Sequence, residues 1–194
     1  FIPSSKPFDL YEPARENRLK LYVKRVFITD NCPELVPPYL SFIRGVIDSE
    51  DLPLNISREM LQNNPVVAKI RSSLVKRTLS DLKKKLLKDR KSFESFWLNF
   101  GPVLKEGIYE DFEKKESLLE IALFKNSKSK ELISLDEYLE GMGKKQKDIY
   151  FMTGDSYENI MNNPGLEGYK SRDINVLILD APVDSFWTSS TPLY

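Results

Sequence analysis

The chain has 194 residues, the size of one large domain or two small ones, and its composition, 41% hydrophobic and 30% charged, is that of a folded globular protein. Its 29 basic and 29 acidic residues cancel, so no net positive field attracts nucleic acid or an anionic membrane. The absence of His excludes Ser-His-Asp and Cys-His catalysis and His-ligated metals. The single cysteine, Cys32, cannot form an internal disulfide, which favours a reducing compartment.

No apolar run approaches the roughly 18 residues that a membrane span requires, and the first residues lack the pattern of a secretory signal. We therefore expect a soluble protein located in the cytoplasm. Because the chain starts with Phe1 instead of Met, we also expect it to be part of a longer polypeptide, whose other segments hold part of the function.

The first third of the chain combines strand and helix signals. The β-branched and aromatic run at residues 19–29 predicts one strand, and residues 42–48 predict a second. Ser57 is a good N-cap for a helix, which Pro65 interrupts or restarts. A long amphipathic helix follows, because apolar residues recur at helical spacing: Val66, Val67, Ile70, Leu74, Val75, Leu79, Leu82 and Leu86.

The middle of the chain is helical by the same criterion. One helix is expected to run through its aromatic residues and to end at Gly101-Pro102, and shorter helical pieces are expected over residues 103–123. Residues 126–130 are polar and lack an apolar anchor, so they are a candidate linker. The aromatic residues at helical spacing are Phe93, Phe96, Trp97 and Phe100.

The last third predicts a small α/β unit. Ser134 caps a helix that Gly141 terminates. A strand at 148–153, a helix at 156–161 and a buried strand at 174–179 predict a right-handed βαβ crossover in a parallel sheet.

The predicted fold is therefore α/β in three parts. Residues 1–88 form a larger α/β sandwich unit, residues 89–125 a short helical connector, and residues 126–194 a smaller α/β unit with the βαβ crossover.

Several common kinds of site are not supported by the spacing of residues. The carboxylates at 48–51, Asp180 and Asp184 lack the spacing of a metal site, so no metal is predicted and they are expected to be solvated. Gly141 and Gly143 lack the spacing of a phosphate loop and act as helix terminators. The basic run at 83–91 either contacts nucleic acid or forms a solvated helix face, and zero net charge favours the second interpretation.

The loop before Ser57 is more informative. Leu52, Leu54 and Ile56 alternate with polar or Pro positions and predict an apolar edge that leads into a helix starting near Arg58. A cation at a helix N-terminus is unfavourable by about 0.3–1 kcal/mol, so Arg58 is either a solvent-exposed residue or one that reaches a phosphate. Gln62, one helical turn later, is expected on the same face, where it orients Arg58 or a phosphate oxygen.

Nearly the whole chain resembles the middle segment of the Hsp90 chaperone family. Residues 42–62 match almost residue for residue, and residues 62–71 are more similar to the bacterial form of the family than to the eukaryotic one. The resemblance is weakest over residues 155–173 and after 184. The other matching segments are residues 20–28, Phe100-Gly101, 104–111, 149–154 and 180–184.

The resemblance implies a chaperone that hydrolyses ATP with Mg²⁺, bound mainly by a separate N-terminal domain, so the isolated chain is not expected to be an enzyme. Arg58 matches the family's Arg that contacts the γ-phosphate, and Asn55 and Gln62 match its supporting polar residues. Phe27 and Leu54, with Leu52, match an apolar patch that docks on the nucleotide domain. Non-native client proteins and a C-terminal domain that forms a homodimer are the other implied partners; no membrane or nucleic acid is expected.

The sequence departs from the family near its end, where Ala181 precedes Pro182 and Ser185 stands at a usually acidic position. Phe186 and Trp187 there are either a client contact or an aromatic anchor for the last helix. Two other functions stay open. One is a self-contained interaction module that binds through the Leu52-Leu54-Ile56 edge without a role in ATP hydrolysis; the other is nucleic-acid binding by the basic helix.

Overall fold

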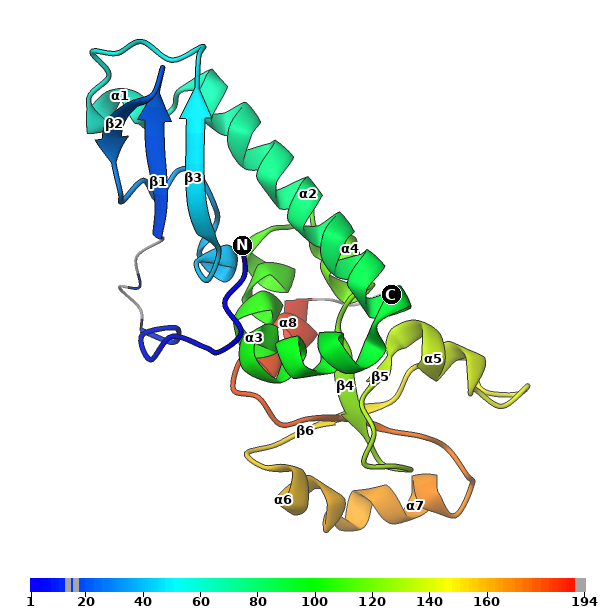
Figure 1. Ribbon diagram of the computed structural model, residues 1–194. Coiled ribbons are helices and arrows are strands. Elements are labelled where there is room, and N and C mark those ends of the chain that lie inside the picture. Colours follow the sequence, from blue (N-terminus) through cyan, green and yellow to red (C-terminus); the bar gives the residue numbers. More distant parts are fainter. Residues whose placement is uncertain (13–14, 16–17, 191–194) are drawn as a thin grey trace. The chain divides into compact units, whose positions relative to one another are not determined.

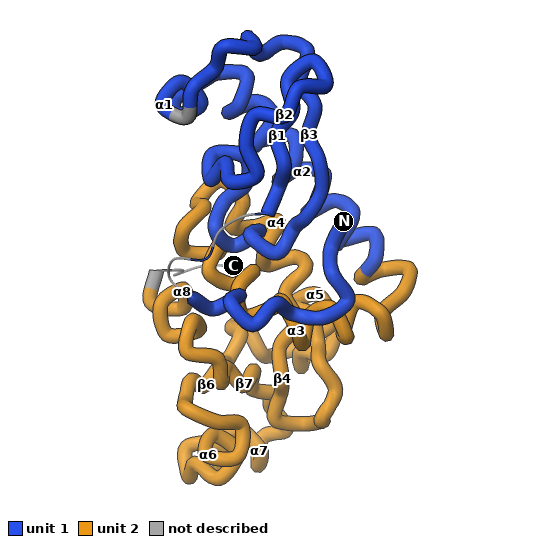
Figure 2. The backbone as a smooth tube through the Cα atoms, turned by 60° about the vertical axis from the view of Figure 1, so that its left-hand side comes forward, with its two compact units in different colours: residues 1–85 blue, residues 86–194 orange. Residues whose placement is uncertain are grey.

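The computed structural model describes residues 1–12, 15 and 18–190. The chain divides into two compact units, residues 1–85 and residues 86–194, each with its own sheet (Figure 1, Figure 2). The fold class is confirmed as mixed α/β. The division into three parts with a separate helical connector stays a prediction.

Unit 1 contains a three-stranded sheet with the order β2-β1-β3. Strand β1 pairs antiparallel with β2 and parallel with β3. Leu19, Leu21 and Val23 point into the core, while Lys20 faces solvent, as the period of a half-buried strand requires. The strands are β1 (Arg18–Val23), β2 (Val26–Thr29) and β3 (Arg44–Ser49).

The prediction of one strand over residues 19–29 is wrong, because the chain reverses at Lys24 and Arg25. Both residues have positive φ angles, 49° and 66°, which match the tight turn favoured in hairpins. The usual Asn-Gly signal is absent, and the turn is instead held by β3. Lys24 N–H donates to the Ser49 carbonyl over 3.1 Å, and Arg25 N–H donates to the Asp48 carboxylate over 3.1 Å.

Two helices follow the sheet, with a short 3-10 helix, η1 (Pro38–Leu40), before β3. Helix α1 spans Arg58–Leu61, and α2 spans Pro65–Lys88. The predicted restart at Pro65 is confirmed, and the Asn64 side chain accepts hydrogen bonds from Val66 and Val67 N–H at 2.9 and 3.3 Å. The buried residues of α2 are Val67, Val75, Leu79, Leu82 and Leu86.

Unit 2 begins with the last residues of α2 and continues with α3 (Arg90–Glu110), which does not end at Gly101-Pro102 as expected. A Cβ atom at Gly101 would lie 2.7 Å from Trp97 Cε2, so glycine lets the indole lie against the helix. Pro102 removes one backbone hydrogen bond, but burial of the apolar side of α3 outweighs that loss. The apolar residues buried along α3 are Phe93, Phe96, Trp97, Phe100, Val103, Leu104 and Ile108.

The sheet of unit 2 has the order β5-β4-β7-β6. Strand β4 pairs antiparallel with β5 and β7, and β6 pairs parallel with β7. The βαβ arrangement is confirmed, since the helical pieces between β6 and β7 connect two parallel strands. The sheet as a whole is not parallel as expected, because β4 runs antiparallel to both of its neighbours. The remaining elements are α4 (Lys115–Leu119), β4 (Leu123–Asn126), β5 (Ile133–Ser134), α5 (Leu135–Glu140), β6 (Phe151–Thr153), α6 (Tyr157–Met161), η2 (Pro164–Leu166), α7 (Glu167–Lys170), β7 (Leu177–Leu179) and α8 (Asp184–Ser190).

Two local predictions in unit 2 had different outcomes. Ser134 caps α5 as expected, and Glu137 completes a capping box by accepting from Ser134 N–H over 2.7 Å. The segment 126–130 is not a linker between units, because it begins the connection between the paired strands β4 and β5. Buried Asn126 accepts from the N–H groups of Lys128 and Ser129 at 3.0 Å, which fixes that turn.

Candidate catalytic loop and exposed apolar surface

The loop between β3 and α1 is fixed by apolar side chains on both sides of its apex. Leu52, Ile56 and Leu61 are buried, with exposed fractions of 1%, 8% and 2%, while Leu54 is 51% exposed. The predicted apolar edge is therefore wrong for Leu52 and Ile56, which point into unit 1. Leu54 alone of the three presents a surface that a partner can contact, so the edge required by a self-contained interaction module is not formed.

The start of α1 follows the sequence prediction. The Ser57 hydroxyl accepts a hydrogen bond from Met60 N–H over 3.3 Å, and Glu59 lies in the first turn. Arg58 is the first residue of the helix; its side chain lies outside the described part of the structure. The backbone thus places Arg58 directly after the exposed apex of the loop.

The two predicted supporting residues lie on either side of Arg58 along the chain. Asn55 is exposed at the apex of the loop. Gln62 is also exposed and is the C-cap of α1, with a helical φ of −63° and an extended ψ of 133°. Its alignment with Arg58 by one helical turn stays a prediction, because the Arg58 side chain lies outside the described part of the structure. Asn63, with φ of 59°, then redirects the chain toward α2.

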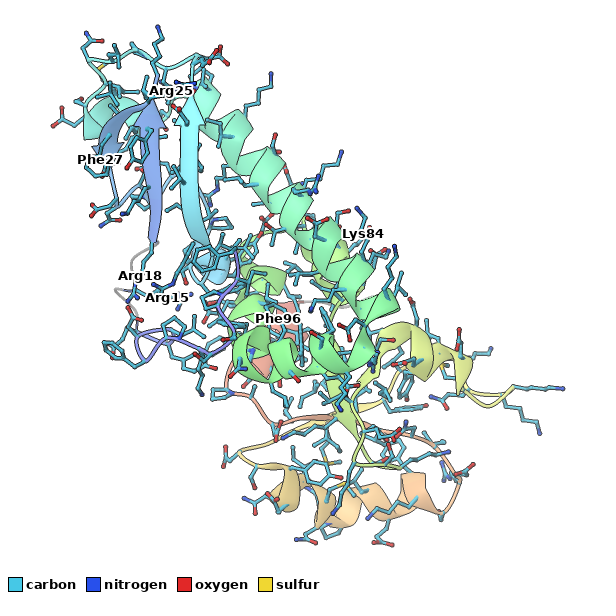
Figure 3. The ribbon with its side chains drawn as sticks, in the orientation of Figure 1. Arg15, Arg18, Arg25, Phe27, Lys84 and Phe96 are labelled. Atoms are coloured by element: carbon cyan, nitrogen blue, oxygen red, sulfur yellow. The ribbon has the colours of Figure 1, made fainter. Side chains whose placement is uncertain are left out.

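The predicted docking residues separate into two groups. Phe27 on β2 and Leu54 are each 51% exposed, whereas Leu52 is buried and supports the loop from beneath. The Phe27 ring packs edge-on against Tyr22, with centroids 5.6 Å apart, and both residues lie in the strand pair β1–β2. Phe27 is labelled on β2 in Figure 3. Leu52 is therefore corrected from a docking residue to an anchor.

Sequence reasoning missed further apolar residues that unit 1 exposes. Val46 is 64% exposed because it pairs with Lys20 on the solvent side of β1 and β3. Val26 and Met60 are also about half exposed. Alternation along residues 44–49 was the signal that could have revealed Val46. We use the name exposed apolar surface of unit 1 for Phe27 and Leu54 together with Val26, Val46 and Met60. Unit 1 also exposes Phe1, Phe8 and Tyr11, which the name does not include.

Phe186 and Trp187 differ in their exposure to solvent. Trp187 is 8% exposed; its Nε1 donates to Asp184 Oδ1 over 2.8 Å, and its ring centroid lies 5.9 Å from that of Phe124. Its prediction as a client contact is therefore wrong, and the alternative of an aromatic anchor describes it. Phe186 is 64% exposed, with its ring 6.0 Å from that of Tyr109.

A buried ion pair in unit 2 was missed. Asp184, expected to be solvated, is fully buried and accepts two hydrogen bonds from Lys105 Nζ, at 2.8 and 3.1 Å. Lys105 Nζ also lies 5.1 Å from the centre of the Phe124 ring. The available signal was Lys105 itself, which follows Trp97 and Gly101 at four-residue intervals along the buried stripe of α3.

The basic side of α2 has the features of a solvated helix face. Asp81 pairs with Arg77 over 2.7 Å and with Lys84 over 3.6 Å, and all three side chains are exposed. Lys84 is labelled on α2 in Figure 3. Arg77 lowers the pKa of Asp81 by hydrogen bonding and charge attraction. Such pairs contribute little to stability and leave the helix in contact with water.

Neither a membrane span nor a metal cluster is found in the part of the chain that the structure describes. None of its helices is both long and apolar enough to cross a bilayer. Within residues 1–12, 15 and 18–190, no group of three or more Cys, Asp or Glu side chains could hold a metal ion. Burial and the neighbouring Glu34 carboxylate raise the pKa of the Cys32 thiol to about 12, so Cys32 stays protonated at neutral pH.

Comparison with known proteins assigns this loop and this fold to one family. The family model described as "Hsp90 protein" matches residues 1–194, and the chain therefore belongs to the Hsp90 family. It is similar over 97% of its length to the solved middle domain of a Plasmodium falciparum heat shock protein, with a TM-score of 0.83 and 32% identity, covering 73% of that chain.

The curated relatives are bacterial, as the segment after Gln62 predicts. The chain is 53% identical to the chaperone protein HtpG of Paramagnetospirillum magneticum and 50% identical to that of Orientia tsutsugamushi, in both cases over all of its 194 residues. It spans 31% of the length of each relative. The chain thus corresponds to the middle domain of an HtpG-type Hsp90.

Proposed function

We propose that this middle domain completes the ATPase site of a chaperone by supplying Arg58 to the γ-phosphate of ATP bound in a separate N-terminal domain. The observation that carries the proposal is the construction of the loop. Buried Leu52 and Leu61 hold its two sides, so the start of α1 stays at an exposed apex. An Arg placed there reaches a partner outside its own domain.

The residues of this chain that could bind phosphate or Mg²⁺ fit part of a nucleotide site better than a complete nucleotide site. The described residues contain neither a cluster for Mg²⁺ nor, by sequence, a glycine-rich phosphate loop. ATP, with its Mg²⁺, supplies the phosphoryl group that is transferred to water. The planar guanidinium of Arg58 binds phosphate oxygens and stabilises the negative charge that develops on them. Asn55 and Gln62, both exposed beside Arg58 in the sequence, provide further polar contacts to its guanidinium or to the phosphate.

The exposed apolar surface of unit 1 supports docking to the nucleotide domain. Phe27 and Leu54 each expose half of their side chains beside polar residues, and burial of such apolar area favours association by about 25 cal/mol per Å². Docking brings Arg58 to the phosphate only when the two domains meet. Hydrolysis is thereby coupled to domain closure, and the isolated chain is not an ATPase.

Further features of the proposal concern the whole protein. We place it in the cytoplasm as a homodimer joined by a C-terminal domain, acting in protein folding on unfolded or partly folded clients. Within this chain, Phe186 is a candidate client contact because its ring is 64% exposed on α8.

The test is ATP turnover by the full-length protein with Arg58→Ala. We expect turnover to fall about 100-fold with little change in ATP affinity, since a group that acts on the transition state lowers the rate constant and not ground-state binding. Arg58→Lys keeps the charge but not the planar fork and should restore turnover only in part. Arg77→Ala is the matched control, because Arg77 is an exposed Arg of the same unit that pairs with Asp81. Unchanged turnover with Arg58→Ala would refute the proposal.

A further inference from the structure

Strand β6 forms one edge of the sheet of unit 2, next to β7 (Figure 2). On the side of β7, the Tyr150 carbonyl accepts from Leu177 N–H over 2.9 Å, and Gly154 N–H donates to the Leu179 carbonyl over 3.2 Å. Along a strand, successive residues direct their main-chain groups to alternate sides. The even-numbered positions from Tyr150 to Gly154 therefore face β7.

Phe151 and Thr153 direct their N–H and C=O groups to the opposite side, away from the sheet. No hydrogen bond from the described residues reaches these groups on that side. Both side chains are exposed, the Phe151 ring by 49%. An exposed strand edge of this kind is a template for pairing with another extended segment.

The other edge of the same sheet is protected by side chains. Next to β5, the Leu132 carbonyl accepts a hydrogen bond of 2.6 Å from Arg90, and Ser134 N–H donates to Glu137. Arg90 and Glu137 are themselves paired over 3.0 Å. Proteins commonly cover sheet edges in this way to prevent unwanted pairing. The absence of such protection at β6, within the described residues, singles out that edge.

A cavity of about 500 Å³ lies beyond the carboxyl ends of β6 and β7. Residues at and after the end of β6 line one side of the cavity, and residues at and after the end of β7 line the other. The cavity therefore adjoins the open edge of the sheet at Thr153. The residues that line it are Thr153, Gly154, Asp155, Leu179, Asp180, Ala181, Pro182 and Ser185.

The helices that follow the two strands lie on opposite faces of the sheet. Ile178 packs with Ile160 of α6 on one face. Lys125 pairs with Ile178 and so shares that face, which places the adjacent Phe124 on the other face, where it contacts Trp187 of α8. The crevice at such a point, outside the carboxyl ends of the strands, is where open α/β sheets bind ligands.

The polar groups of the cavity favour a cation. Asp155 makes no ion pair with any residue in the described ranges, while Asp180 pairs with Lys125 over 2.5 Å. The Ser185 hydroxyl donates to the Pro182 carbonyl over 3.2 Å, which leaves its oxygen as an acceptor. Carboxylate and hydroxyl oxygens accept hydrogen bonds from an ammonium or a guanidinium group.

We propose that the outer edge of β6 binds an extended polypeptide segment as an added strand, and that the cavity takes a Lys or Arg side chain of that segment. Main-chain hydrogen bonds to Phe151 and Thr153 provide affinity that does not depend on sequence, and Asp155 provides a preference for basic residues. The proposal deepens the client-binding part of the proposed function and rests on it, because a non-native client exposes unpaired extended segments.

The experiment uses the full-length chaperone and a short fluorescent peptide of alternating Val and Thr with one Arg. A second peptide has norleucine in place of Arg, and binding is followed by anisotropy. Thr153→Pro removes only an N–H group that faces away from the sheet, so the bond between Gly154 and Leu179 is kept. Thr153→Val keeps that N–H group and is the matched control.

We expect Thr153→Pro to weaken both peptides by about tenfold, the effect of losing one main-chain hydrogen bond, while Thr153→Val binds the norleucine peptide normally. Asp155→Asn should abolish the preference for the Arg peptide and leave the norleucine peptide unchanged. If Thr153→Pro fails to fold, Thr153→Lys replaces it, because an edge lysine blocks strand addition while keeping the backbone intact.

Normal peptide binding by Thr153→Pro or by Thr153→Lys would overturn the edge proposal. So would a result in which these two variants change only self-association of the protein. A preference for Arg that survives Asp155→Asn would overturn the role of the cavity. ATP turnover, measured on the same variants, separates this proposal from the one for Arg58. If the peptides do not bind while Arg58→Ala still abolishes turnover, the edge proposal alone fails.

Discussion

Two short helices, α1 in unit 1 and α8 in unit 2, are held in place in opposite ways. Helix α1 has four residues and is capped by its own neighbour, Ser57. Helix α8 has seven residues and begins at Asp184, whose buried carboxylate is bound by Lys105, 79 residues away in the sequence. One helix is fixed by local signals and nearby apolar anchors, the other by a long-range ion pair.

This difference distinguishes polar residues that stabilise the fold from polar residues that are available for a function. At α8, the polar atoms of Asp184 and Trp187 are used in internal contacts. At α1, apolar side chains do the holding, and the polar residues Asn55 and Gln62 remain exposed. A polar residue next to a short helix is thus a better functional candidate when the helix is anchored by other side chains.

The largest expected effect is on α8. Lys105→Ala leaves the Asp184 carboxylate buried without its cation, and breaking such a pair costs roughly 3–5 kcal/mol. The free energy of unfolding in urea would measure it. Arg77→Ala, which breaks the exposed pair with Asp81, should change the free energy of unfolding much less, because water screens that pair. Similar losses in the two variants would show that the pair does not hold α8.

The second prediction compares the loss of stability at Leu52, which anchors the loop, with that at Leu54, which lies at its apex. Leu52→Ala should reduce the free energy of unfolding by about 2–5 kcal/mol, because Leu52 is 1% exposed. Leu54→Ala should change it by less than about 0.5 kcal/mol, because half of that side chain is in water. In the full-length protein, Leu54→Ala should nevertheless reduce ATP turnover. Equal destabilisation by the two variants would contradict the division of the loop into anchor and apex.

The elements that follow from local signals were predicted from the sequence. The apolar period of α2 and the caps at Ser57 and Ser134 all act within a few residues. The candidate site was located for the same reason, since an Arg after an N-cap is visible in the sequence, and the family resemblance then gave it a role.

What the sequence did not predict depends on contacts between distant segments. The Lys24-Arg25 turn is held by Asp48 and Ser49 of another strand. Leu52 and Leu54 are the same residue type, so the sequence does not show which of them is buried. The packing of unit 1 buries Leu52 and exposes Leu54. The burial of Asp184 depends on a lysine in another helix. Side-chain polarity alone does not reveal such partners.

A smaller effect concerns pH and unit 1. Burial, with the hydrogen bond to Glu34, raises the pKa of Cys32 to about 12, above that of an exposed thiol. The native state therefore keeps a proton that the unfolded state loses at high pH, and stability falls as pH rises above about 9, by up to ~1.4 kcal/mol per unit. Cys32→Ala should remove this part of the pH dependence, as measured by urea unfolding at a series of pH values. The same slope in both proteins would exclude Cys32 as its source.

The smallest effect sharpens the description of α1. Ser57→Ala removes the acceptor for Met60 N–H, and loss of an N-cap costs about 1 kcal/mol. Because Leu61 and Leu52 still anchor the loop, we expect the loss to appear as faster hydrogen exchange at Met60 and not as unfolding of unit 1. ATP turnover in the full-length protein should fall only a fewfold, since the backbone at Arg58 is loosened while its guanidinium remains. A loss as large as that of Arg58→Ala would mean that the cap, and not the apolar anchors, sets the position of Arg58.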